Sequence, residues 1–400
     1  AALAILLPIT FGMRPEGAVI MLAAIYYGSQ YGGTITSILL NTPGESSSVA
    51  STFDGYPLAQ QGRAGPALVM QAVASFVGGT LGVILITVLA PAFTQLTRSF
   101  GPPEFFLLVM MGLSTLIVMV GGNWRYGLIS ALVGFALGTV GVDLETGQTR
   151  FTFRSAELIG GIDFIPIAIG LFGLGELYYA FYTGMHLTGS GGIVQYQKEK
   201  RFWPGLRDYV ETRFALLRGS VLGFVVGVIP GAGATIASLM SYSLEKSVSR
   251  TPEKFGKGAM AGLVGPEAAN NAASSGAMVP LLTLGIPGSA ATAVLLAAFV
   301  LWGLTPGPLL MSQKPEFAWG LIASMYLGNV ALLALNIFAI PLFVQMVKLP
   351  YRILAPAVIL VCTVGTYSVN ASPIETWLMF AAGLAGFFMK LHGFSPAALV

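Results

Sequence analysis

Long apolar segments are the feature that most restricts how this chain can fold. A helix needs about 20 apolar residues to cross the hydrocarbon core of a bilayer. The sequence offers such stretches at 17–40, 66–91, 104–121, 125–142, 158–183, 317–347, 353–371 and 374–391, and interrupted ones at 219–243 and 258–304. Only 9% of the residues are charged, whereas soluble domains carry about 25%. We therefore predict an all-α polytopic membrane protein with about 10–11 membrane segments.

Composition and missing motifs disfavour several classes of function. Cys362 is the only cysteine and the two histidines, His186 and His392, lie far apart, so neither a disulfide framework nor a zinc site is expected. The sequence shows no basic face of the kind that would indicate nucleic-acid binding. The motifs G-x-x-x-x-G-K-[ST], H-E-x-x-H and G-x-S-x-G do not occur in the sequence, which argues against ATP hydrolysis and against an enzyme.

Basic residues divide the chain. The polar stretch 184–218 holds Lys198, Lys200, Arg201, Arg207, Arg213 and Arg218, so the positive-inside rule places it in the cytoplasm. We interpret it as a linker between a first membrane half, 1–183, and a second, 219–400. The first half begins with "AALAILLP", which has no basic region of a signal peptide. We expect both chain ends to be cut within membrane segments.

The segment 219–243 lies between two basic flanks, because 244–258 is also rich in lysine and arginine. One straight span would put these flanks on opposite faces. A re-entrant segment that turns at the central "PGAG" (230–233) keeps them on one face, and we favour it over a span kinked at Pro230. Glycines recur every fourth residue from Gly219 to Gly231. Such a stripe allows close helix packing, and it serves either static contact or sliding.

Three short anchors occur twice in the same order. "RPEG" (14–17) matches "GPEA" (265–268), "LLNTPGESS" (39–47) matches "TLGIPGSAA" (283–291), and "PPEF" (102–105) matches "KPEF" (314–317). Repeated halves with paired Pro/Gly breaks are typical of secondary transporters, which bind substrate between discontinuous helices. The order of the anchors does not distinguish inverted from parallel repeats.

A polar stripe runs through "VGPEAANNAASSGAMV" (264–279). Glu267, Asn270, Asn271, Ser274 and Ser275 recur at the spacing of one helix face. An acidic side chain at the centre of a membrane helix costs about 2.5–3.5 kcal/mol on insertion scales. The stripe is therefore expected to face protein or a water-filled cavity, either as hydrogen bonds between helices or as a lining for substrate or ion.

The Pro-Gly breaks predict an anion site, because the N-terminus of the following helix offers free N–H groups and a positive dipole end. We assign substrate binding to both breaks and the stripe, at Asn41, Thr42, Pro43, Gly44, Ser46, Ser47, Asn270, Asn271, Ser274, Pro287, Gly288, Ser289 and Thr292. Ion coupling is assigned to Glu267, Asn270, Gly231 and Gly233. Glu45 does not fit an anion site, and it is expected at the rim or as a ligand for a cation.

Long stretches of the sequence resemble the large membrane subunit of tripartite tricarboxylate transporters. The resemblance lies in "YGGTITSILLNTPGESSSVASTFDGYPLAQQGRAGPAL" (31–68), "TVGVDLETGQTRFTF" (139–153), "GVIPGAGATIASLMSYSLEK" (227–246), "GPEAANNAASSGAMVPLLTLGIPGSAATAVLL" (265–296) and "LTPGP" (304–308). The family's signatures carry onto Asn41, Pro43, Gly44, Asp54, Gly55, Tyr56, Pro57, Pro230, Gly231, Gly233, Glu267, Asn270, Asn271, Pro287 and Gly288. Family members usually have a further Pro-Gly break ahead of residue 4, and they continue past residue 400.

The resemblance implies a multi-pass protein of the bacterial inner membrane that imports small carboxylates. Its expected partners are a small membrane subunit and a periplasmic solute-binding protein. Na⁺ or H⁺ would drive symport, with no other cofactor or metal. A passive anion channel is the alternative, and an intramembrane enzyme is a third possibility that the lack of a nucleophile–base pair disfavours.

Overall fold

The computed structural model describes residues 3, 6–41, 43–98, 101, 103–104, 106–107, 110, 124–142, 148–153, 158–162, 166–167, 169–183, 202–230, 233–307, 309–339, 351–370, 372–394 and 399. The α-helices are α2 (Pro15–Leu40), α3 (Val49–Leu58), α4 (Ala64–Arg98), α6 (Trp124–Gly138), α8 (Gly175–Thr183), α9 (Leu206–Val228), α10 (Gly233–Val248), α11 (Met260–Leu284), α12 (Ala290–Leu301), α13 (Leu310–Gln313), α14 (Pro315–Phe338), α16 (Tyr351–Asn370) and α17 (Pro373–Leu391). Shorter helical turns are η1 (Leu7–Gly12), η2 (Ser46–Ser48), η3 (Ala59–Arg63), η5 (Ile169–Leu174) and η6 (Pro252–Lys254). The described residues include one two-stranded antiparallel sheet, in which β1 (Gly141–Val142) pairs with β2 (Thr149–Arg150).

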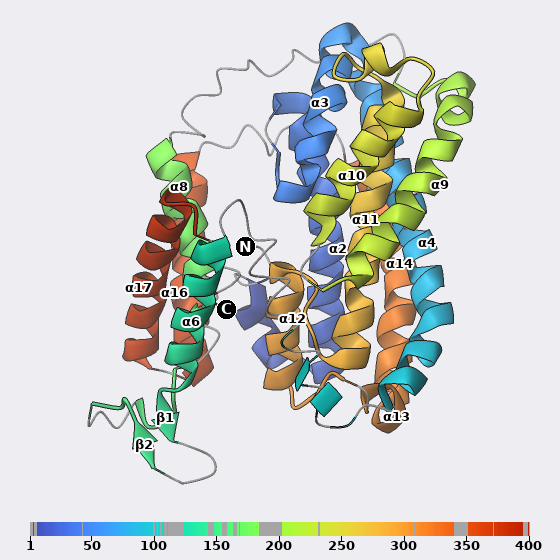
Figure 1. The fold of residues 1–400 in the computed structure, drawn as a ribbon. Coiled ribbons are helices and arrows are strands. Elements are labelled where there is room, and N and C mark those ends of the chain that lie inside the picture. The colour runs from blue at the N-terminus through green and yellow to red at the C-terminus, as the bar shows by residue number, and fades with distance from the viewer. Residues whose placement is uncertain are drawn as a thin grey trace.

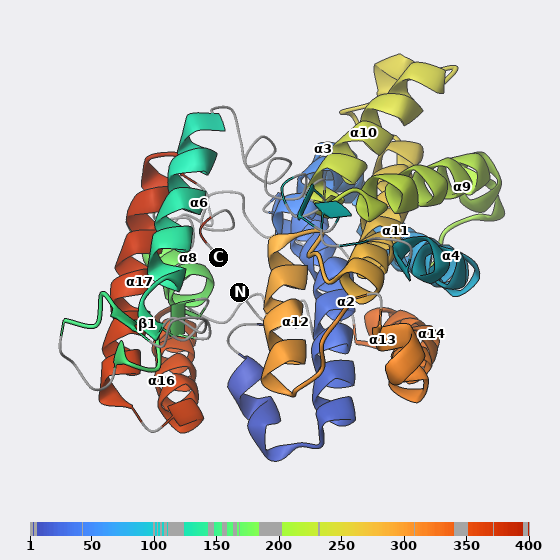
Figure 2. The same cartoon turned by 60° about the horizontal axis from the view of Figure 1, so that its bottom comes forward.

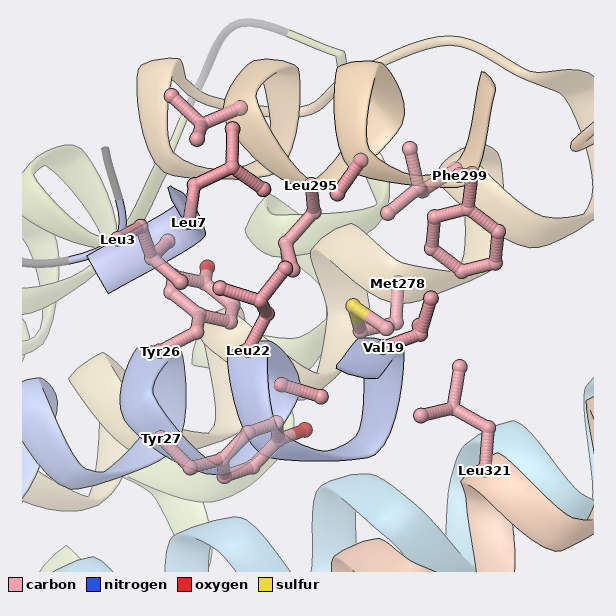
Figure 3. Close-up of a cluster of buried hydrophobic side chains, with 14 of the residues drawn as sticks. Leu3, Leu7, Val19, Leu22, Tyr26, Tyr27, Met278, Leu295, Phe299 and Leu321 are labelled. Carbon is pink, nitrogen blue, oxygen red and sulfur yellow. The ribbon is translucent and has the colours of Figure 1, made fainter. Parts of the chain in front are cut away.

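Helix α11 is the centre of the larger of two helix groups (Figure 1). Every residue from Gly262 to Thr283 is buried, because α11 packs against α2, α3, α4, α9 and α10. Helices α6, α8, α16 and α17 form a second group that stays separate in both views (Figures 1 and 2). Contacts of α16 with η1 join this group to the first. An apolar cluster that includes Leu22 of α2, Leu295 of α12 and Met278 of α11 fills the space between those helices (Figure 3).

Four of the expected spans coincide with helices. The stretches 17–40, 66–91, 353–371 and 374–391 correspond to α2, α4, α16 and α17. Within 317–347, helix α14 ends at Phe338 and residues 340–347 lie outside the described residues. Nearly all of 104–121 also lies outside them.

Two expected spans are shorter than predicted. Helix α6 ends at Gly138, and residues 141–142 form a strand instead of continuing the helix to 142. In 158–183, residues 158–162 are not a continuous helix, and the described helical run reaches from 169 to 183. Glycines explain both differences, since Gly141 and Gly161 take positive φ angles of 120° and 87°, which a helix does not accept.

The described part of the chain contains helices of membrane-spanning length and hydropathy at Ser46–Gln95, Pro315–Phe338 and Pro373–Leu391. Their outer surfaces stay apolar: Val88 of α4, Leu327 of α14 and Trp377 of α17 are 66%, 75% and 72% exposed. Such side chains suit a lipid environment. Helices α2 and α11, with 26 and 25 residues, are also long enough to span a membrane, but they carry polar faces that turn inward. The total of about 10–11 segments stays a prediction.

Helices α9 and α10 form a hairpin around Pro230. Arg218 of α9 pairs with Glu245 of α10, donating from Nε and Nη2 at 2.8 and 2.5 Å. This contact between residues on opposite sides of the turn means that the two helices run antiparallel. The described parts of the two basic flanks, 202–218 and 244–258, therefore lie at one end of the molecule, as the re-entrant interpretation requires, whereas a kinked span would separate them. Helix α9 begins at Leu206, so the end of the expected linker, 206–218, is helical.

The glycine stripe of α9 packs against α11. A Cβ atom at Gly219, Gly223 or Gly227 would lie 2.2–2.3 Å from a backbone oxygen of α11. The partner residues on α11 are Gly265, Ala269 and Ala273, which also recur every fourth residue. Two stripes of small residues in this register place the backbones in direct contact, so the structure supports the static role.

Candidate functional site

The two Pro-Gly breaks have the same local structure. Helix α2 ends at Asn41 and helix α11 ends at Gly285, both in the left-handed conformation with φ angles of 54° and 71°. Asn and Gly are the residue types that most readily adopt this conformation. Proline follows two residues later in each case, and the next glycine folds back onto the preceding helix. Gly44 donates its N–H to Gly33 O at 3.0 Å, and Gly288 packs against Ala277, the same number of residues back.

The helices that contain the breaks run in opposite directions. Thr34 of α2 contacts Glu267 of α11, and Tyr27, earlier in α2, contacts Ser275, later in α11. Helices α2 and α11 are therefore antiparallel. After each break the chain starts a new helix. Helix α3 runs toward the beginning of α11, and helix α12 runs toward the end of α11 (Figure 1). The two helix–break–helix units thus have inverted orientation, a question that the order of the sequence anchors left open.

Three helix N-termini meet beside the middle of α11. Glu45 begins the turn before α3, and Ser289 caps α12 by accepting the Thr292 N–H at 3.3 Å. The first turn of α10 lies between them, since Thr235 shares a 2.9 Å hydrogen bond with Ser46 and Gly233 lies next to Ser289. First-turn N–H groups lack partners within their own helix, so their positive dipole ends point at one region.

Glu267 is buried and fully hydrogen-bonded. Thr34 and Ser51 donate to its Oε2 at 2.6 and 3.2 Å. Ser75, Gln71 and Asn271 donate to Oε1 at 2.7, 3.2 and 3.3 Å. The donors come from α2, α3, α4 and α11, so this carboxylate joins four helices. The polar stripe thus forms hydrogen bonds between helices at Glu267, one of its two expected roles.

The stripe changes character next to Glu267. Asn270 is fully buried, and neither its side-chain nitrogen nor its oxygen has a hydrogen-bond partner among the described residues. Asn271 donates to Glu267, but its Oδ1 is likewise unpartnered in the described part of the chain. Unsatisfied buried amide atoms cost about 1–3 kcal/mol each. Their presence at the meeting point of the three helices indicates a place for a ligand or an ion.

Glu45 lies at this meeting point too. Its side chain is partly buried against Gly33, and its Oε1 accepts a 2.6 Å hydrogen bond from Ser47, which also donates to Gln30 Oε1 at 3.1 Å. The carboxylate lies beside the side chain of Asn270. Glu45 therefore lies inside the candidate site rather than at its rim, and its expected role as a ligand for a cation stays a prediction.

The predicted site residues fall into three groups. Those at the centre are Ser46, Ser47, Gly233, Glu267, Asn270, Asn271, Ser274, Ser289 and Thr292. Those that shape the breaks are Asn41, Pro43, Gly44, Pro287 and Gly288, of which Asn41 is exposed and caps α2 rather than facing the centre. Thr42 and Gly231 lie outside the described residues.

Sequence reasoning missed one side of the site. Helix α2 contributes Tyr26, Tyr27, Gln30 and Thr34 to the centre, and the Tyr26 hydroxyl lies next to Ser274 and Ser289. These residues recur at helical spacing within an apolar span, which was the available signal. Gln71 and Ser75 of α4 show the same pattern. Aromatic and small polar residues are common in membrane helices, so the pattern alone indicated no function.

Comparison with known proteins agrees with this geometry. A model of the tripartite tricarboxylate transporter TctA family matches residues 1–400. An uncharacterized 52.8 kDa protein in the TAR-I ttuC' 3'region of Agrobacterium vitis is 43% identical over the whole chain and 79% of its own length. An uncharacterized protein in the TAR-II ttuC' 3'region of the same organism is 44% identical over 178 residues, which are 44% of this chain and 74% of the relative. No solved structure matches. The chain therefore belongs to the TctA family, the large membrane subunits of tripartite tricarboxylate transporters, and it is a transport protein rather than an enzyme.

Proposed function

We propose that the chain imports small di- or tricarboxylates by cation symport, with a substrate carboxylate bound where α3, α10 and α12 begin. The observation that carries the proposal is that these three N-termini meet beside the middle of α11, where the amide of Asn270 has no hydrogen-bond partner among the described residues. In this family the transporter is tripartite. We therefore assign a periplasmic binding protein as the source of substrate, a small membrane subunit as a partner, and the bacterial inner membrane as the location.

Backbone dipoles supply the positive potential of the proposed site. The buried polar side chains of the described residues include no lysine or arginine. An anion in the interior must therefore be held by helix N-termini, hydroxyls and amides, which together suit a carboxylate. Ser46, Thr235 and Ser289 place hydroxyls at the three N-termini. Because this recognition is not tied to one chain length, it accommodates carboxylates of different size.

Inverted helix–break–helix units favour active transport over a passive channel. In alternating-access transporters such units meet at a central site and rock against one another. The assignment of ion coupling to Glu267, Asn270, Gly231 and Gly233 stays a prediction. The five hydrogen bonds to Glu267 bear on it, because a cation would have to displace donors from this carboxylate.

Uptake into proteoliposomes tests the proposal. The large subunit, the small subunit and the binding protein are reconstituted together, and uptake of radiolabelled citrate, malate and tartrate is followed with and without Na⁺ and H⁺ gradients. We expect gradient-driven accumulation of at least one of these probes. The double substitution Ser289→Ala with Thr292→Ala should weaken uptake, and Ser243→Ala, an exposed hydroxyl at the far end of α10, is the matched control.

Two outcomes would overturn the proposal. Flux that dissipates a substrate gradient without accumulation would identify a passive anion channel. Uptake that stays at the wild-type level when Ser289 and Thr292 both lose their hydroxyls would place the carboxylate elsewhere.

A further inference from the structure

The two breaks match in structure but differ in charge at one position. Glu45 and Ser289 occupy the same place, directly after Pro-Gly and at the start of the capping turn. Ser48 and Thr292 complete the two turns in the same way. One half-site therefore presents a hydroxyl to a ligand, whereas the other already contains a carboxylate. The inverted units are equivalent in backbone and unequal in chemistry.

The environment of Glu45 is incomplete in a way that the environment of Glu267 is not. Glu267 accepts hydrogen bonds on both oxygens from five donors. Within the part of the chain that the structure describes, the side chain of Glu45 accepts a hydrogen bond from Ser47 at 2.6 Å. Beside it lies the amide of Asn270, whose nitrogen and oxygen have no hydrogen-bond partner among the described residues. A carboxylate with an amide oxygen beside it can bind Na⁺ through both oxygens. Alternatively, the carboxylate can take up a proton and donate a hydrogen bond to the amide oxygen.

The charged and titratable groups near Glu45 favour its neutralisation. Glu267 and the Tyr26 hydroxyl are its neighbours among such groups on α11 and α2. Neither supplies a positive charge. Asn270 and Ala277, which mark the levels of the two breaks on α11, are about 10 Å apart at 1.5 Å per helical residue. A substrate carboxylate near Ser289 would therefore lie close enough to the Glu45 carboxylate to be repelled by its charge.

We propose that Glu45 is the residue that couples cation to substrate in this transporter. One coupling cation, a proton on the carboxyl group or Na⁺ held with the Asn270 oxygen, neutralises Glu45. Substrate then binds at the N-termini of α10 and α12 without repulsion. This inference rests on the proposed function and assigns its coupling step to Glu45 in place of Glu267.

The test separates binding from coupling. The complete three-component transporter is reconstituted with Glu45→Gln, whose side-chain oxygen can still accept from Ser47. Exchange of external labelled citrate for internal citrate needs binding and reorientation but no net cation movement. We expect the variant to keep exchange and to lose gradient-driven accumulation and all dependence on Na⁺ or pH. Glu45→Asp, which keeps the carboxylate, should retain accumulation with a shifted cation requirement.

The controls identify the cation and the cause of failure. If accumulation by the wild type depends on the pH gradient and not on Na⁺, the coupling cation is a proton. If it depends on Na⁺ and not on the pH gradient, the coupling cation is Na⁺. Glu16→Gln, an exposed carboxylate at the start of α2, should leave coupling unchanged. Absence of accumulation in the wild type would refute the proposed function itself.

Two results would overturn the inference alone. In one, wild-type transporter accumulates substrate and Glu45→Gln does so with the same cation dependence. In the other, Glu45→Gln unfolds at the wild-type temperature but loses exchange together with accumulation, which would make Glu45 part of the carboxylate site.

Discussion

The buried carboxylate of Glu267 gives the sharpest test of what holds the larger helix group together. Replacing it with alanine removes the acceptor for five donors. The hydroxyls of Thr34, Ser51 and Ser75 can turn to backbone carbonyls one helical turn earlier. The Gln71 amide keeps Tyr31 O and Ser75 Oγ as acceptors, at 3.0 and 3.2 Å. The Asn271 amide keeps the backbone oxygen of residue 267 at 3.0 Å, so its second N–H is the donor that loses its acceptor.

The expected cost of Glu267→Ala has two parts. The second N–H of Asn271 is left without an acceptor, which costs about 1–3 kcal/mol. Removing most of a fully buried side chain also leaves a cavity, and such large-to-small substitutions cost about 2–5 kcal/mol. Glu267→Gln keeps an oxygen toward the amides and turns its NH₂ toward Thr34 and Ser51, whose hydroxyls can accept. It exchanges charged for neutral hydrogen bonds and should cost only about 1–2 kcal/mol.

Thermal unfolding of the purified protein in detergent measures the difference. We expect the order wild type, Glu267→Gln, Glu267→Ala in decreasing midpoint, with the larger step between the last two. Glu16→Ala, at the exposed start of α2, serves as the control and should not move the midpoint. The reasoning fails if alanine at position 267 is as stable as wild type, or if glutamine costs as much as alanine.

Three further substitutions test the packing around α11. Gly223→Ala would place a Cβ atom 2.2 Å from a backbone oxygen of α11, so it should destabilise the protein by about 1–3 kcal/mol, whereas Val225→Ala on the exposed face should have little effect in the same unfolding assay. Arg218→Ala should lower the unfolding midpoint more than Glu245→Ala does, because Glu245 is 2% exposed and Arg218 is 40% exposed. A buried charge without its partner costs about 3–5 kcal/mol. Equal midpoints for the two variants would refute this asymmetry. Asp54→Ala removes an oxygen that accepts three backbone N–H groups in the turn before α11, at 2.7–2.9 Å, and should increase proteolysis of that turn; unchanged cleavage would show that the turn is held by other contacts.

Local signals in the sequence were enough to locate much of the site. Proline, glycine and hydroxyl residues mark both breaks, and the spacing of the polar stripe placed Glu267 and Asn270 on one helix face. The residues that the polar stripe contacts could not be read from the local sequence. Glu267 meets residues of α2, α3 and α4 that lie more than 190 positions away in the chain, the nearest being Ser75 at a separation of 192. Their polar groups looked like ordinary interruptions of apolar spans.

The sequence by itself determined the helical membrane class, the positions of both breaks and the family, because hydropathy, Pro-Gly pairs and long signatures are read residue by residue. Only the tertiary structure decided that α2 and α11 run antiparallel, that α9 and α10 return to the same end, and that three helix N-termini meet beside the middle of α11. Helix direction depends on contacts between distant segments. The tertiary structure also distinguishes Glu267 from Glu45: five donors satisfy Glu267, whereas Glu45 lies beside the Asn270 amide, which has no partner among the described residues.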